Sequence, residues 1–173
     1  MSDMKHSALH DAFAHHVWAT LRVIDACVPL TTDQLAAAVP GTYGSILEIV
    51  RHLVGADAAY LFVTSSGRRS LIDEDEMGLP QLRSVMVENA PAWQSLLSED
   101  PDADQMVVRR RDDGSESHAP MGIRLSQALH HGTDHRSQIC TALTTLGIEP
   151  PAIDVWDFAR EYGRAFETPA TAR

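Results

Sequence analysis

Residues 121–146 read MGIRLSQALHHGTDHRSQICTALTTL, the longest stretch of the chain in which apolar residues recur at helical spacing. Counted at about 100° per residue, the apolar residues gather on one face, between roughly 60° and 120° from His131. They are Met121, Leu125, Ala128, Ile139, Leu143 and Leu146. Gly147 and the Pro150-Pro151 pair stop the pattern. The stretch therefore predicts a long amphipathic helix that ends near Leu146.

Three other segments show the same helical period. Pro29 closes the first segment, and Ser45 with Glu48 forms a capping box at the start of the second. Pro91 lies inside the third, where it predicts a kink or an early break. The predicted ranges are about 4–28, 45–62 and 79–97. Four such helices bury their apolar stripes well as a bundle, so the expected fold class is an all-α four-helix bundle.

The segments between and after these helices carry weaker signals. Residues 64–78 lack periodicity and predict an exposed loop. Met106–Val108, the Asp112-Asp113-Gly114 turn signal and an arm to His118 suggest a small β-hairpin. The sequence also predicts a short C-terminal helix over about residues 153–166. We expect residues 1–173 to form a single domain, because the chain is long enough for one core and short for two.

Composition excludes several functions. The formal charge is 14 − 24 = −10, which repels nucleic acid and anionic lipid. No stretch approaches the ~20 apolar residues of a membrane helix, and the start of the chain lacks the pattern of a signal peptide. We therefore expect a cytoplasmic protein that binds neither nucleic acid nor membrane. Cys27 and Cys140 have no CxxC spacing and are read as small core residues in a reducing compartment.

The histidines of the long helix are the strongest candidates for chemistry. His131 and His135 lie roughly 40° apart around the axis and about 6 Å along it, so they share a face that borders the apolar stripe. His52 borders the apolar stripe of the second helix in the same way. Three imidazoles on two facing helices can meet in space and bind Zn, Ni, Co or Fe, with positions left for water or substrate.

Spacing alone leaves a structural role for these histidines open, because the chain has nine histidines and an i, i+4 pair is only a moderate signal. His15, His16 and His118 are weaker ligand candidates. His130 lies about 100° from His131 and cannot share its direction.

Several stretches resemble the DinB-like superfamily. Residues 131–138, HGTDHRSQ, are similar to its HxxxHRxQ helix, and residues 45–57, SILEIVRHLVGAD, are similar to the segment that supplies its first histidine. Residues 151–158, PAIDVWDF, resemble its PxxDxWxY tail, with Phe in place of the usual Tyr. Trp18-Ala19 also fits, although Thr20 stands where Asn is frequent. Together these matches cover most of the chain.

The resemblance implies a four-helix bundle in which His52, His131 and His135 bind a divalent metal, Ni or Zn, in a cleft. It also implies a homodimer. The activity implied is a metal-dependent transferase that uses a low-molecular-weight thiol, or a hydrolase, acting on a small electrophilic molecule. The alternative is a non-catalytic stress-response protein that binds a metal or a ligand.

Such a metal would lower the pKa of a coordinated thiol or water. A thiol from solution fits the sequence, because Cys140 lies about 180° from His131 and Cys27 ends the first helix.

Four further side chains are candidates for supporting roles. Glu48, Asp134 and Gln138 can orient imidazole N–H groups, with ordinary surface solvation as the alternative. For Arg136, an ion pair with Asp157 or Glu161 is favoured over binding of an anionic substrate.

Overall fold

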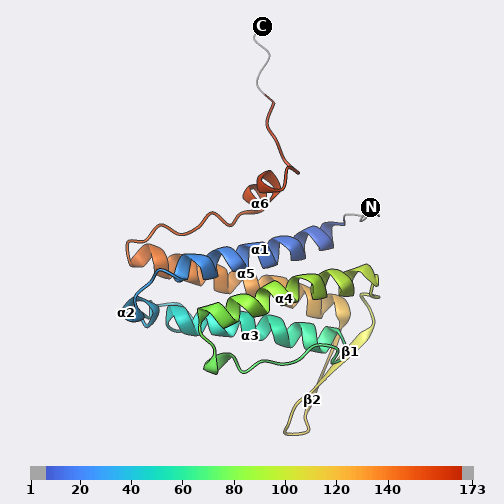
Figure 1. Cartoon of the computed structure of the whole chain (residues 1–173). Helices are drawn as coiled ribbons and strands as arrows, with labels where there is room; N and C mark the ends of the chain where they lie inside the picture. The colour runs from blue at the N-terminus through green and yellow to red at the C-terminus, as the bar shows by residue number, and fades with distance from the viewer. Residues whose placement is uncertain (1–6, 169–173) are drawn as a thin grey trace.

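The computed structural model describes residues 7–168, and within them four long helices lie side by side as a bundle (Figure 1). They are α1 (Ala8–Cys27), α3 (Ile46–Thr64), α4 (Leu79–Ser98) and α5 (Met121–Thr145). Helix α1 packs against α4 and α5, and α3 packs against the same two helices. The helical bundle expected from the apolar periodicity is thus confirmed, and α3 and α5 are direct neighbours.

Smaller elements connect and flank the bundle. The hairpin predicted from the sequence is present as an antiparallel pair in which Met106 faces Pro120 and Arg110 faces Glu116. It projects from one end of the bundle, and α6 lies against α1 (Figure 1). The bounds are α2 (Thr32–Leu35), the 3₁₀ turn η1 (Glu74–Glu76), β1 (Met106–Arg110), β2 (Glu116–Pro120) and α6 (Val155–Glu161).

Local hydrogen bonds explain where the two histidine-bearing helices begin and end. At the start of α3, Ser45 N–H donates to Glu48 Oε2 at 2.7 Å and Glu48 N–H donates to Ser45 Oγ, which is the predicted capping box. At the start of α5, the N–H of Met121 donates to a loop carbonyl, that of Gln105. Gly147 follows the end of α5 with φ +74°, a conformation that favours glycine.

The four long helices bury their apolar stripes in one shared core. Its largest fully buried side chains come from every helix of the bundle, and burying each one contributes roughly 1.5–3 kcal/mol. They include Phe13 and Ile24 on α1, Ile49 and Leu53 on α3, Met86 and Trp93 on α4, and Ile139 and Leu143 on α5. This packing holds α3 against α5.

Helix α4 runs through Pro91 to Ser98, so the early break suggested as one outcome of this proline does not occur. Proline removes the hydrogen bond to the carbonyl four residues earlier, here that of Val87. Both Pro91 and Val87 are exposed, so water can donate a hydrogen bond to the Val87 carbonyl. The buried side chains on the opposite face of α4 continue without interruption.

Two segments outside the bundle differ from expectation. Helix α6 is shorter than predicted, because Asp154 accepts hydrogen bonds from the N–H groups of Trp156 and Asp157 at its start and Gly163 adopts φ +66° after its end. The loop after α3 contains η1, which packs on α3. A Cβ on Gly55 would lie 2.3 Å from Glu74 Cδ, so this glycine makes room for the loop.

Within residues 7–168, no helix is both long enough and apolar enough to cross a membrane.

Candidate metal centre

His52, His131 and His135 come together where α3 packs against α5. One nitrogen from each ring can be chosen so that all three lie within 4.8 Å of one another. Nε2 of His131 lies 3.1 Å from Nε2 of His52, and the ring centroids of His131 and His135 are 4.4 Å apart. The three residues predicted from the sequence are therefore brought together, because the two helices that carry them are packing neighbours.

Aromatic side chains border this cluster. Tyr43 stacks on His52 with 4.2 Å between ring centroids and 10° between ring planes, and it meets His135 edge-on. Its N–H donates to Gln138 Oε1 at 2.8 Å, which ties the segment before α3 to α5. Tyr60 meets His131 edge-on from α3. Tyr43 was missed in the sequence because it lies in a connector without periodicity.

The environment favours the neutral form of His131 and His135. Burial lowers the pKa of His131 to about 4, and repulsion from His135 and His52 adds to this effect. Burial also lowers the pKa of His135, with a further contribution from His52, while a hydrogen bond with Gln138 opposes the change. Neutral imidazole is the form that binds divalent metals.

One buried nitrogen supports the fit of a metal to these residues. Among the described residues, Nδ1 of His135 is buried and has no hydrogen-bond partner. Leaving a buried polar atom unpaired costs about 1–3 kcal/mol. Three imidazoles, one of them with an unpaired buried nitrogen, are a suitable donor set for a divalent metal ion.

The depressed pKa values predict that the metal-free protein loses stability in acid. Below the ordinary histidine value of 6.5, the unfolded chain binds protons that folded His131 and His135 do not bind until the pH falls further. The free energy of unfolding should therefore fall as the pH drops from 6.5 toward 4. Urea denaturation of metal-free protein across this range measures the slope. A His131→Ala/His135→Ala variant should have a shallower slope, and equal slopes would contradict these pKa directions.

The predicted supporting residues have different roles in the structure. Gln138 accepts a hydrogen bond from Tyr43 N–H, and its interaction with His135 raises the pKa of that histidine. Glu48 is used in the cap of α3, and no hydrogen bond joins it to the cluster within the described residues. Asp134 is exposed and acts on His131 and His135 only through its charge, which raises their pKa values.

The other histidines discussed above lie outside the cluster. His15 contacts the carbonyl oxygen of Ile153 at 2.8 Å, and His118 contacts Glu116 in the hairpin. His130 is exposed, as its angle on the helix requires. His16 is buried, and its ring nitrogens contact Asp57 on α3 and Arg136 on α5.

The expectation for Arg136 is wrong. Its side chain is 3% exposed and points into the bundle, where Nη1 lies 2.9 Å from His16 Nδ1 and 3.1 Å from Thr20 Oγ1. Asp157 pairs with Arg160 and Glu161 pairs with Arg22 instead. The physical reason is helical geometry, since the position after His135 is turned by about 100° and faces α1.

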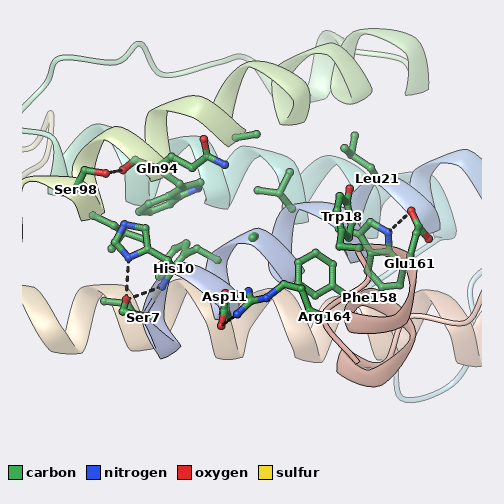
Figure 2. A pocket seen from close by; sticks show the side chains of 18 of the residues that line it. Ser7, His10, Asp11, Trp18, Leu21, Gln94, Ser98, Phe158, Glu161 and Arg164 are labelled. Atoms are coloured by element: carbon green, nitrogen blue, oxygen red, sulfur yellow. Dashed lines mark hydrogen bonds and ion pairs between the residues drawn. The ribbon is translucent and has the colours of Figure 1, made fainter. Parts of the chain in front are cut away.

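A large groove lies away from the histidine cluster. It has a volume of about 1040 Å³, is lined by α1, α4 and α6, and contains none of the three cluster histidines. Figure 2 shows Trp18 and Phe158 on its wall, with Trp18 Nε1–H donating to Glu161 Oε1 at 3.0 Å and Arg164 paired with Asp11. These bonds attach α6 to α1. The candidate metal centre is therefore defined by donor chemistry and not by cavity size.

The fold and the site together define a class, a helical bundle with a cluster of three histidines between two adjacent helices that can hold a metal ion. The sequence profile of the DinB family matches residues 1–165, and the chain belongs to that family. The matched region includes both histidine segments and α6. No curated protein matches the chain.

Proposed function

We propose that the protein is a metal-dependent transferase of the low-molecular-weight thiol type, or a hydrolase, that acts on a small electrophilic molecule. The observation that carries the proposal is the cluster of three imidazoles from α3 and α5, in which the pKa values of His131 and His135 are lowered. Three protein ligands are typical of catalytic sites, which keep a position open. A bound Ni or Zn ion lowers the pKa of a coordinated thiol or water and so supplies a nucleophile near neutral pH.

The cysteines of the chain support an external nucleophile. Burial raises the pKa of the Cys27 thiol to about 12, and burial also raises the pKa of Cys140. Since the thiolate is the reactive form, both thiols are inert at neutral pH. A thiol-dependent reaction at this site would therefore use a small thiol from solution. Tyr43, which is 59% exposed and stacks on His52, offers that thiol or the electrophile an apolar face beside the histidines.

The second candidate function is a non-catalytic metal- or ligand-binding stress-response protein. The observation that favours it is the position of the groove in Figure 2, which lies on α1, α4 and α6 and not at the histidines. A protein that only holds a metal needs no substrate cavity beside it.

Turnover of electrophiles separates the two functions. The protein, loaded with Ni²⁺ or Zn²⁺, is incubated with a small thiol and a panel of epoxides, haloaromatics and activated esters. Product formation should depend on metal and should disappear in His131→Ala. It should persist in His130→Ala, which changes the exposed neighbouring histidine. If no electrophile reacts faster with the loaded protein than with His131→Ala, the enzyme proposal fails and the binding function is favoured.

We also propose that the protein is a homodimer. Support comes from α6 and its surroundings, where Trp156 is 65% exposed, Val155 59% and Phe166 85%. Exposed apolar side chains gathered in one region are typical of interaction surfaces. Sedimentation velocity should give the mass of two chains for the wild type and of one chain for Trp156→Glu. A monomeric wild type would contradict the proposal.

A further inference from the structure

A second polar cluster, here called the buried network, lies in the centre of the bundle. Its six side chains are each at most 9% exposed, and every long helix contributes at least one. They are His16 and Thr20 on α1, Asp57 on α3, Asn89 and Trp93 on α4, and Arg136 on α5. None of them belongs to the histidine cluster described above.

Hydrogen bonds determine the protonation of His16. A guanidinium can only donate, and Arg136 Nη1 lies 2.9 Å from His16 Nδ1, so Nδ1 accepts and carries no proton. The proton is therefore on Nε2, which donates to Asp57 Oδ1 at 2.9 Å. His16 is a neutral bridge between the guanidinium of Arg136 and the carboxyl group of Asp57.

Asp57 is surrounded by donors. Asn89 Nδ2 donates to Oδ2 at 2.8 Å, and Trp93 Nε1–H lies 3.1 Å from Oδ1 and 3.3 Å from Oδ2. With His16 these groups satisfy both oxygens as acceptors, which describes an ionised carboxylate. Burial lowers the pKa of Arg136 to about 10, against the opposing charge of Asp57, so Arg136 is charged at neutral pH. The buried network is thus an ion pair bridged by an imidazole.

Gly132 shows how closely the bridge fits against α5. A Cβ at this position would lie 2.3 Å from His16 Cε1 and 2.9 Å from Arg136 Nη1. Glycine inside a helix costs about 1 kcal/mol relative to alanine. Because Gly132 has no side chain, the His16 ring can approach the backbone of α5 closely. Gly132 lies between His131 and His135 in the sequence.

We propose that the buried network positions the candidate metal ligands, by holding α3 and α5 in one register along their axes. Its charged ends lie on the two helices that carry the histidines. Asp57 follows His52 by five residues on α3, and Arg136 is the residue after His135 on α5. The register of α3 against α5 sets how closely His52 approaches the other two histidines. This inference rests on the proposed metal centre.

The chemistry of the buried network explains why it selects a register. A shift of one residue moves a helix by about 1.5 Å, which would break hydrogen bonds of 2.8–3.1 Å and leave buried charges unpaired. Apolar contacts are not directional and tolerate a small slide better. The apolar core therefore holds the helices together, and the buried network determines their register along their axes.

A matched pair of variants at His16 tests the proposal. His16→Gln keeps an N–H for Asp57 and a carbonyl for Arg136, whereas His16→Leu has neither. Co²⁺ is titrated into each folded variant, because its visible absorption bands report ligand geometry. We expect His16→Leu to bind Co²⁺ about 10–100-fold more weakly than the wild type, with shifted bands. His16→Gln should retain most of the wild-type affinity. Wild-type affinity and bands in folded His16→Leu would overturn the proposal.

Leu82→Ala controls for general loss of stability. Leu82 is fully buried on α4, seven residues before Asn89, and belongs to neither histidine cluster nor buried network. This variant should be less stable than the wild type and still bind Co²⁺ with wild-type affinity and bands. Equal weakening of Co²⁺ binding in Leu82→Ala and His16→Leu would mean that the buried network affects binding only through the stability of the fold. That result would overturn the proposal.

A metal-free measurement separates this inference from the metal centre. In protein labelled with ¹⁵N-histidine, the imidazole resonances of His52, His131 and His135 should move in His16→Leu and stay in Leu82→Ala. Unmoved resonances overturn the positioning role, whether or not the protein binds metal. Failure of the wild type to bind Co²⁺ overturns the proposed function only. Thr20→Val, which removes one acceptor of Arg136, should move the same resonances less and serves if His16→Leu does not fold.

Discussion

Replacing His131 with alanine is expected to weaken the binding of Ni²⁺ or Zn²⁺ by at least about 100-fold, the upper range for losing an outer-shell partner of a metal ligand. His131 is one of three imidazoles in the candidate metal centre, and its Nε2 lies 3.1 Å from that of His52. Removing it leaves two ligands on separate helices. Titration calorimetry of metal into metal-free protein, with a competing chelator, measures the change.

His130→Ala is the matched control for this prediction. His130 is the preceding residue on α5 and is exposed, so the variant removes an imidazole without touching the cluster. Its affinity for Ni²⁺ or Zn²⁺ should equal that of the wild type. Equal weakening in the two variants would mean that metal binds to histidines at the surface.

Replacing Asp57 with alanine is expected to lower the free energy of unfolding by about 3–5 kcal/mol. The carboxylate accepts hydrogen bonds from His16, Asn89 and Trp93, and its charge balances that of buried Arg136. Without it these groups stay buried and lose their partner. The loss is a large share of the roughly 5–15 kcal/mol that stabilises a typical domain. Urea denaturation of the metal-free proteins measures it.

Asp134→Ala provides the comparison for Asp57→Ala. Asp134 is exposed on α5, where a substitution usually changes stability by about 0.5 kcal/mol or less. A loss of less than about 1 kcal/mol in Asp57→Ala would contradict the account of Asp57 as the carboxylate of a buried ion pair.

The long helices and the histidine cluster could be predicted from the sequence because both depend on local helical geometry. Helical periodicity and the Ser45 capping box place α3 within two residues of its observed ends. The same angular count puts His52, His131 and His135 at the edges of apolar stripes that must face other helices. Once α3 and α5 are neighbours, these positions converge.

The buried network could not be predicted in this way, because its members lie far apart in the sequence. His16 and Arg136 are separated by 120 residues, and their contact depends on which helices become neighbours. A count along one helix gives the direction of Arg136 but not its partner. Gly132 carried a signal, since a glycine inside a strong helical pattern indicates close approach of another group. Identifying that group as His16 required the structure.

Tyr43 and the groove on α1 and α4 were missed for a different reason. Both are formed where segments without a shared period meet, and their positions follow from loop conformation and from the docking of α6. Pro91 is a related case. Its effect on α4 depends on whether it faces solvent or the core, and it faces solvent.

The most direct test of the metal centre is elemental analysis of protein purified without a metal-affinity tag, beside the His52→Ala and His131→Ala variants. His52 and His131 lie on different helices, so loss of metal in both variants requires one shared site. We expect about one equivalent of Ni or Zn per chain in the wild type and almost none in either variant. No metal in the wild type, even after reconstitution, would contradict the metal centre and make the histidine cluster structural.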